Sequence, residues 1–282
     1  MNYYNEIDPF CCRWLKNLMD AGLIPPGDID NRSIIDVRPD DLDGYTQHHF
    51  FAGIGGWSYA LRLAGWPDDR PVTTASCPCQ PFSIAGKGEG TNDERHLWPA
   101  FRWLVGQRRF SIIFGEQVAS KAGREWLAGV RDDMETMGYE VGAADLCAAS
   151  VGTPQNRPRL WWVADTWRVE SRKGGIARSK KSSWSERGAR PCVGSESGSV
   201  GDTMQQGLAT VRQEQAGLSS SSYWKESRAI ECGDGITRRI EPSIAPLVDG
   251  IPGRVGRLRG YGNAIVPQVA AEFIQAYMEA LA

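Results

Sequence analysis

The sequence predicts an α/β domain built around a mainly parallel sheet. Three observations predict it: short apolar runs typical of buried strands, helical patterns of apolar residues between them, and glycine or proline at the joints. Strands and helices that alternate along a chain favour parallel pairing, because each helix carries the chain back across the sheet. With 282 residues and 41% hydrophobic side chains, the chain can bury a sizeable core.

The first predicted element is a helix over residues 8–22. Phe10, Trp14 and Leu18 recur at helical spacing there, and Pro9 suits a first helical turn. A connection rich in Pro and Asp follows. Within it, residues 33–37 predict a short strand.

From about residue 46 the pattern becomes strand, turn, helix, strand. Further strands are expected at residues 48–52, 72–75, 111–114, 139–146 and 160–164. Helices are expected at residues 57–64, 97–108, 123–137 and 267–281. Residues 168–235 are rich in Ser, Gly, Arg and Gln with weak periodicity, which predicts a small irregular domain or a partly disordered insertion.

The charge is unevenly distributed along the chain, although the net charge is only −2. Residues 1–150 carry 14 Lys and Arg against 21 Asp and Glu, whereas residues 151–282 carry 18 against 13. This asymmetry favours a second half that faces a polyanion. The polar N-terminus does not resemble a signal peptide and no apolar stretch is long enough to span a bilayer, so we expect a cytoplasmic protein with reduced thiols.

Cys79 lies in the run Ser76-Cys77-Pro78-Cys79-Gln80-Pro81-Phe82-Ser83. A thiol presented next to proline is typical of a rigidly held nucleophile, and the alternative is a buried structural cysteine. Cys77 and Cys79 are too close together for the usual spacing of zinc ligands, and the sequence has only three His residues. We therefore expect no metal site, and we interpret Cys77 as a packing residue.

Two further segments lie where α/β sheets bind ligands. The glycine turn Gly53-Ile54-Gly55-Gly56 separates a predicted strand from a helix, which lets backbone approach a ligand, although glycine also serves plain tight turns. Glu116 directly follows a predicted buried strand, where partial burial would raise its pKa; the alternative is an acid that stabilises a helix start.

Two segments nearer the C-terminus are ambiguous taken singly. Arg157 and Arg159 alternate, so in an extended chain both point to one side, where they suit phosphates or a carbonyl oxygen. A solvated arginine pair is the alternative. Asn263 precedes a helix that starts with proline and could simply cap it.

Together, the order and identity of these segments resemble the DNA cytosine-5 methyltransferase family, over about residues 46–166 and 250–282. The matching motifs are Phe51-Ala52-Gly53-Ile54-Gly55-Gly56, Pro78-Cys79-Gln80, Glu116-Gln117-Val118 (Gln for the family's Asn), Gln155-x-Arg157-x-Arg159 and Gly262-Asn263-Ala264. The resemblance implies a Rossmann-like fold dependent on S-adenosylmethionine.

The resemblance implies that Cys79 attacks C6 of a flipped-out cytosine in double-stranded DNA, that Glu116 protonates N3 and that Arg159 holds O2. C5 then takes the methyl group. The cofactor-binding residues that it implies are Phe51, Gly53, Ile54, Gly55, Gly56, Pro78, Asn263 and Ala264. Gln80, Ser83, Gln155 and Arg157 are expected on the DNA side, with Arg157 either contacting phosphate or bracing a loop.

The resemblance also suggests how the chain is divided. We expect an N-terminal extension (residues 1–45), a catalytic domain (46–166), a target-recognition region (167–245) and a C-terminal segment that returns to the catalytic domain (246–282). The protein resembles bacterial or phage enzymes of restriction-modification systems, and a monomer without a membrane partner is expected.

The interval between Gly53 and Cys79, 26 positions, is shorter than the family pattern. Members of the family normally fit two strands and a helix there, with one acid for the cofactor's ribose and another for its adenine. We hypothesise that the N-terminal extension, through the helix at 8–22 and the strand at 33–37, fills the vacated sheet edge. Asp36, Asp68 and Asp69 are then the ribose candidates, or else plain surface acids.

Two other functions stay open: a DNA-binding relative without catalysis, and an RNA cytosine-5 methyltransferase.

Overall fold

A computed structural model describes residues 1–78, 97–153, 157–166, 228–231, 237–240, 260 and 262–281 of the chain. Its main sheet contains β1 (Asn2–Asn5), β2 (Gly27–Asp30), β3 (Gln47–Phe50), β4 (Val72–Ala75), β5 (Ile112–Val118), β6 (Glu140–Cys147) and β7 (Pro158–Asp165). The helices are α1 (Pro9–Asp20), α2 (Gly56–Leu63), α3 (Trp98–Arg108), α4 (Lys121–Thr136) and α8 (Pro267–Glu279). Short 3-10 helices are η1 (Ile34–Asp36), η2 (Pro39–Leu42) and η5 (Ala148–Val151), and β8 (Arg228–Glu231) pairs with β9 (Thr237–Ile240) in a separate hairpin.

The main sheet has seven strands in the order β2-β1-β3-β4-β5-β7-β6. Neighbours from β2 to β5 pair in parallel, and β7 runs antiparallel between β5 and β6. The predicted α/β class with a mainly parallel sheet is confirmed, and the architecture is Rossmann-like.

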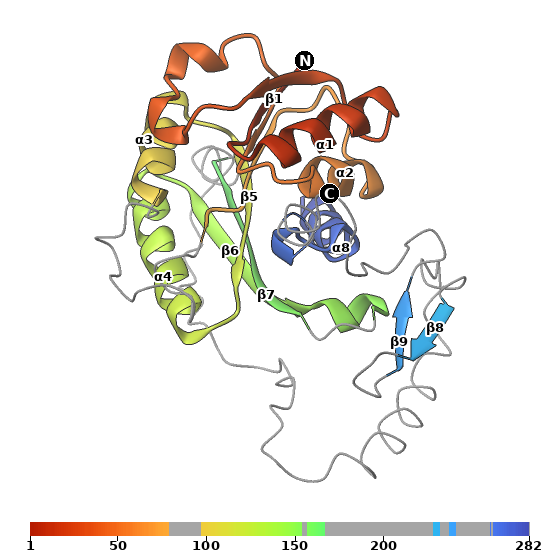
Figure 1. Cartoon of the computed structure of the whole chain (residues 1–282). Coiled ribbons are helices and arrows are strands. Elements are labelled where there is room, and N and C mark those ends of the chain that lie inside the picture. Colours follow the sequence, from red (N-terminus) through yellow and green to blue (C-terminus); the bar gives the residue numbers. More distant parts are fainter. Residues whose placement is uncertain are drawn as a thin grey trace.

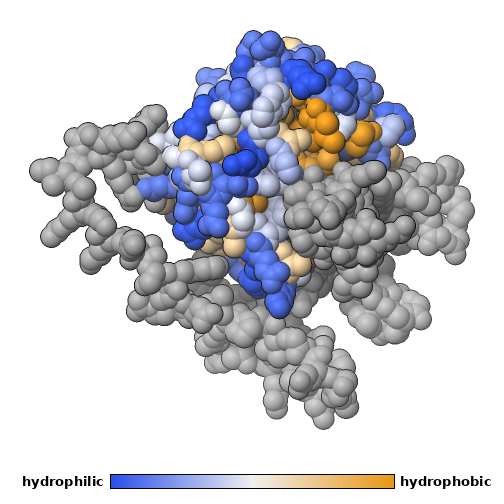
Figure 2. All heavy atoms as spheres, turned by 90° about the vertical axis from the view of Figure 1, so that its left-hand side faces the viewer, coloured by the Kyte–Doolittle hydropathy of each residue, from blue (hydrophilic) through white to orange (hydrophobic). Residues whose placement is uncertain are grey.

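The helices cover the sheet in two layers (Figure 1). One face carries α2 and α8, whose side chains pack around Trp57, Phe114 and Trp161, and α1, which packs around Tyr4. The other face carries α3 and α4, packed around Phe50 and Trp162. Figure 2 looks onto the side where α3 and α4 lie, and most of its described surface is hydrophilic, as expected of helices that bury one face only.

Two strands of the sheet come from the N-terminus. β1 pairs with β3 and β2 pairs with β1, so both extend the edge beyond the strand that precedes the glycine turn. The N-terminal region therefore fills this edge, as hypothesised, but through β1 and β2 and not through residues 33–37; α1 matches the helix predicted at residues 8–22. The strand predicted at residues 33–37 is wrong: η1 occupies that place, because Ser33 caps a single tight turn and only Ile34 is buried within it.

The crossover through α2 has an unusual hand. α1 leads from β1 outward to β2, whereas α2 leads from β3 in the opposite direction to β4, yet both helices lie on the same face. α3 and α4 advance in the same direction as α2 but on the other face. The α2 crossover is therefore opposite in hand to the other three. Since about 98% of such connections are right-handed, α2 makes the rare left-handed one.

The helix ends follow from local sequence. The Asp8 carboxylate accepts hydrogen bonds from Phe10 N at 2.7 Å and Cys11 N at 3.3 Å, which caps α1 and places Pro9 in its first turn. α8 begins at Pro267 behind Val266, so Asn263 lies outside the helix and does not cap it.

Two adjacent histidines lie in the central strand β3 and point to opposite faces. Burial lowers the pKa of His48 to about 4 and that of His49 to about 3. His49 Nδ1 lies 2.9 Å from Thr74 Oγ1, and the ring stacks on Tyr4. Both rings therefore stay neutral at neutral pH, as the middle of a sheet requires.

We predict that acid destabilises the fold through these histidines. Below about pH 6.5 the two histidines bind protons in the unfolded chain but stay neutral in the folded chain. The free energy of unfolding therefore falls with decreasing pH, by about 1.4 kcal/mol per pH unit for each histidine. The decline through His48 ends near pH 4. Urea unfolding between pH 4 and pH 7 measures it. His48→Phe should reduce the slope of the unfolding free energy against pH by the contribution of one histidine. An unchanged slope contradicts the prediction.

Candidate functional site

The glycine turn joins β3 to α2 and bends sharply. Phe51 has φ 52°, Gly53 φ 56° and Gly55 φ 83°, all in the left-handed region. A Cβ on Gly53 would meet no atom within 4 Å, so this side of the turn is open. Gly55 is the N-cap of α2 and supplies no side-chain cap, which leaves the amide groups of the first turn available to a ligand.

Glu6 lies directly after β1 and holds this turn from the side. One carboxylate oxygen accepts the Gly53 N–H at 2.7 Å, and the other accepts the Asp8 N–H at 2.8 Å. Burial raises the pKa of Glu6, although both backbone donors favour the carboxylate. The sequence analysis missed this residue. Its signal was an acid after a short run with two tyrosines, a composition that favours a strand.

The acids named from the sequence lie elsewhere. Asp68 follows α2 and pairs with Arg62 at 2.7 Å, at the amino ends of the strands, and Asp69 is in the same turn. Asp36 is exposed at the end of η1. Asp30 ends β2, where it accepts hydrogen bonds from Tyr3 and Arg32. Because ligands bind at the carboxyl ends of parallel strands, Glu6 replaces Asp36, Asp68 and Asp69 as the candidate acid.

The stem of the Cys79 segment leaves the carboxyl end of β4. The Trp57 indole N–H donates to Ser76 Oγ at 3.0 Å, and Gln117 Nε2 lies 3.5 Å from the Cys77 carbonyl oxygen. Cys77 is buried in the core around Phe50, in agreement with its interpretation as a packing residue. The described chain stops at half-buried Pro78.

Glu116 and Arg159 form a buried ion pair at the carboxyl edge of the sheet. Arg159 Nε lies 2.6 Å from Glu116 Oε1, and the two side chains are 16% and 11% exposed. Glu116 follows Phe114 by two residues, so both point to the face that carries α2 and α8. Burial raises the pKa of Glu116, and this effect exceeds the opposing one of the arginines. Burial therefore favours the protonated carboxyl group more than water does.

Arg157 takes a different direction from Arg159. Its Nη2 donates to the carbonyl oxygens of Gly262 at 2.9 Å and Ala264 at 3.0 Å. Asn263, between them, is exposed. A Cβ on Gly56 would lie 2.7 Å from the Ile265 side chain, so this loop also packs closely against the start of α2.

The structure thus brings most of the predicted residues to one edge of the sheet. The glycine turn, Pro78, Glu116, Arg159 and the loop of Asn263 and Ala264 come from distant parts of the chain. Four predicted residues lie outside the described residues: Cys79, Gln80, Ser83 and Gln155.

The site residues fit a nucleoside cofactor. The open side of Gly53 gives backbone access, the uncapped turn of α2 offers N–H donors, and Glu6 supplies a carboxylate beside them. Within the described ranges, no group of three His, Cys, Asp or Glu side chains is placed to hold a metal ion. In the same ranges, no helix combines the length and apolar character that a membrane crossing requires.

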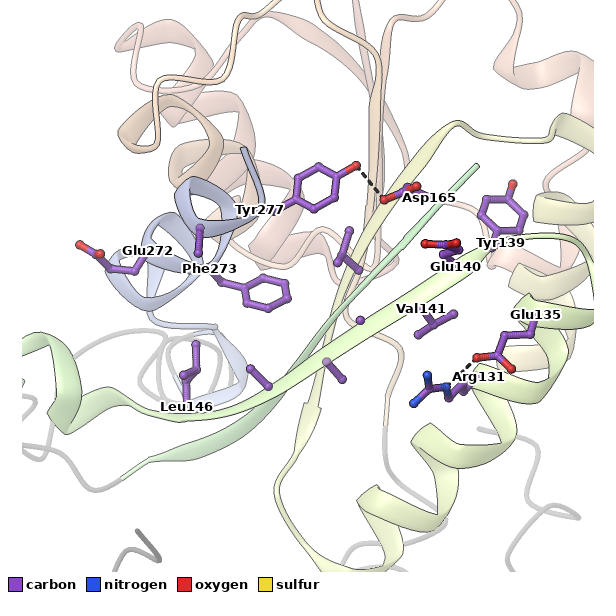
Figure 3. Close-up of a pocket in the computed structure, with 15 residues that line it drawn as sticks. Arg131, Glu135, Tyr139, Glu140, Val141, Leu146, Asp165, Glu272, Phe273 and Tyr277 are labelled. Carbon is purple, nitrogen blue, oxygen red and sulfur yellow. Dashed lines mark hydrogen bonds and ion pairs between the residues drawn. The ribbon is translucent and has the colours of Figure 1, made fainter. Parts of the chain in front are cut away.

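A separate cavity of about 780 Å³ lies against edge strand β6, between α4 and α8 (Figure 3). Tyr277 donates to Asp165 there at 3.1 Å, and Arg131 pairs with Glu135. Glu116 and Arg159 are not among the described residues that line it. This cavity is distinct from the candidate site.

Comparison with known proteins finds a similarity to DNA methylases. Residues 65–187 match the family model of the C-5 cytosine-specific DNA methylases. The match begins after the glycine turn. In the family pattern two strands follow this turn, whereas here two strands, β1 and β2, precede it in the chain.

Individual relatives agree with this family. The type II methyltransferase M.HhaI of Haemophilus parahaemolyticus is 26% identical over 169 residues, covering 46% of this chain and 52% of the relative. M.AplI of Arthrospira platensis is 33% identical over 104 residues, covering 36% of this chain and 29% of the relative. The chain therefore spans about half of the former methylase and less of the latter.

Solved structures of methyltransferases also align. The Spodoptera frugiperda DNMT2 mutant has 18% identity and TM-score 0.39, covering 58% of this chain and 41% of that one. The Entamoeba histolytica methyltransferase EhMeth has 14% identity and TM-score 0.41, covering 58% and 44%. Both TM-scores are low, and the Rossmann-like architecture is assigned from the strand order of the sheet.

We predict that Gly115, which precedes Glu116, tolerates no side chain. A Cβ there would lie 2.2 Å from the rigid ring of Trp162 across the sheet. Gly115→Ala should therefore destabilise the protein by about 1–3 kcal/mol or more, measured by urea unfolding. Gly129→Ala, on exposed α4 with no atom within 4 Å, is the matched control and should be neutral or slightly stabilising. Equal effects of the two changes would contradict the prediction.

Proposed function

We propose that this protein transfers a methyl group from S-adenosylmethionine to C5 of a cytosine in double-stranded DNA. The observation that carries the proposal is the buried Glu116–Arg159 pair, which lies on the same sheet edge as the glycine turn and the stem of the Cys79 segment. The target base would have to leave the helix stack, because Glu116 and Arg159 are largely buried and cannot reach a base within the duplex.

The chemistry asks three tasks of this chain. The Cys79 thiolate forms a bond to C6 of cytosine, which makes C5 nucleophilic. Glu116 delivers a proton to N3, which accepts the electron pair displaced by that attack. Arg159 donates hydrogen bonds to O2 and stabilises the charge that develops there. Loss of the C5 proton, departure of the Cys79 thiolate and return of the N3 proton to Glu116 then restore the aromatic base.

Several residues would hold the cofactor, which supplies the methyl group when bound. The open face of Gly53 and the N–H groups of the first turn of α2 suit its amino acid portion. Glu6 suits the ribose hydroxyls, because a carboxylate accepts hydrogen bonds from paired hydroxyl groups. Phe51, Ile54, Gly55, Gly56, Pro78, Asn263 and Ala264 complete the proposed set.

A methyl-transfer assay tests the proposal directly. The protein is incubated with labelled S-adenosylmethionine and either duplex DNA or tRNA, and nucleosides are separated after digestion. Labelled 5-methylcytosine from DNA is the expected result. Label in tRNA alone would indicate the RNA enzyme, and no label in either would indicate a relative that only binds DNA.

We predict opposite outcomes for the two neighbouring cysteines. Cys79→Ala should abolish methyl transfer, because it removes the thiolate that forms the bond to C6. Cys77→Ala should retain most activity, because Cys77 is buried in the core around Phe50. Initial rates at saturating S-adenosylmethionine measure both. Equal loss in the two variants would refute the assignment of the nucleophile.

We predict that Glu6→Gln weakens cofactor binding by about tenfold or more, because a charge-assisted hydrogen bond is lost. Equilibrium dialysis with labelled S-adenosylmethionine measures it, with Glu125→Gln on exposed α4 as the matched control. A cofactor analogue without the 2′-hydroxyl should bind the wild-type protein weakly. Its affinity for the Glu6→Gln variant should be only slightly lower than for the wild type. Unchanged affinity in a folded Glu6→Gln protein would eliminate Glu6 as the ribose acid.

A further inference from the structure

The two arginines at the start of β7 do different work. Arg159 pairs with Glu116 at 2.6 Å. Arg157, which immediately precedes β7, instead places Nη2 within 3.0 Å of two backbone carbonyl oxygens. Those carbonyls belong to Gly262 and Ala264, more than 100 residues further along the chain. One guanidinium nitrogen thus bridges both sides of Asn263.

The segment that Arg157 contacts contains a helical turn, in which the Ala264 N–H donates to the Gly260 carbonyl oxygen at 3.1 Å. Ile265 packs against Gly56 so closely that a Cβ on Gly56 would lie 2.7 Å away. A Cβ on Gly260 would meet Phe10 at 3.0 Å and Ile54 at 3.4 Å. At the end of this turn the carbonyl oxygens of Gly262 and Ala264 accept hydrogen bonds from Arg157, which tie the backbone on both sides of Asn263 to the start of β7.

Its hydrogen bonds argue against a DNA phosphate as the partner of Arg157 Nη2. This nitrogen donates to two backbone carbonyl oxygens, and Nε is buried with no partner among the described residues. A charged donor forms strong hydrogen bonds with such carbonyls. Side chains that anchor a phosphate direct these donors to the DNA backbone instead.

We propose that Arg157 is a positioning residue that fixes the Gly262–Ala264 loop for S-adenosylmethionine and does not contact DNA. The proposal rests on the function proposed above, since it assigns this loop to the cofactor. It also gives β7 a dual role: Arg159 faces the base and Arg157 secures the cofactor loop. A rigid strand therefore sets the distance between the two ligands.

The test measures the two ligands separately. Variants Arg157→Ala and Arg157→Lys are compared with the wild type and with Arg131→Ala, which removes an exposed arginine of α4 outside the site. S-adenosylmethionine affinity is measured by equilibrium dialysis without DNA. DNA affinity is measured without cofactor at several salt concentrations. Thermal unfolding identifies variants that fold, and the lysine variant serves if the alanine variant does not.

The expected result is a cofactor Kd raised about tenfold by Arg157→Ala and partly restored by lysine, because two hydrogen bonds from a charged donor are lost. DNA affinity and its salt dependence should not change. A lost phosphate contact would instead lower DNA affinity and reduce the slope of log K against log salt by about one, which would overturn the proposal. Wild-type cofactor affinity in the variants would also overturn it. If the wild type itself bound no cofactor, the proposed function would fail first.

Discussion

The structure depends on the parallel pairing of β1 with β3. This pairing aligns Asn5 with Phe50, so the residues that follow the two strands emerge side by side. Glu6 then reaches the Gly53 N–H at 2.7 Å, and the Ala52 N–H reaches the Asn5 carbonyl at 3.0 Å. A strand from the extreme N-terminus thereby defines one wall of the site. β1, α1 and β2 precede the glycine turn in the chain and occupy the sheet edge beside it, where the short interval between the turn and Cys79 leaves no room for other strands.

The same arrangement explains the left-handed crossover through α2. Glu116 and Arg159 point to the face that carries α2 and α8. A right-handed crossover from β3 to β4 would carry α2 to the opposite face and turn the glycine turn away from them. The close approach of Ile265 to Gly56 would also be lost. Keeping α2 on the face of the site therefore requires the uncommon hand. Packing of Trp57 and Leu61 in the core under α8 offsets that cost.

Most of the fold and about half of the site follow from sequence, and the exceptions have physical reasons. β4, β5 and β7 are apolar runs in the middle of the sheet, so their composition identifies them. β2 is Gly-Asp-Ile-Asp at the sheet edge, where charged residues are tolerated and composition carries little strand signal. Glu6 went unrecognised because its partner Gly53 is 47 residues away. Likewise, alternation placed Arg157 and Arg159 on one side, but only the folded chain shows that their partners differ.

The balance of burial and charge around Glu116 decides what the site can do. A carboxylate beside one exposed arginine would have a lowered pKa. Here the carboxyl group is buried, and burial raises its pKa despite Arg159 and Arg157. Arg157 is turned toward the carbonyls of Gly262 and Ala264, so among the described residues only Arg159 makes direct contact with the carboxyl oxygen. Burial and this single direct partner therefore act against each other on Glu116, and burial has the larger effect, which favours the protonated form that the proposed reaction requires.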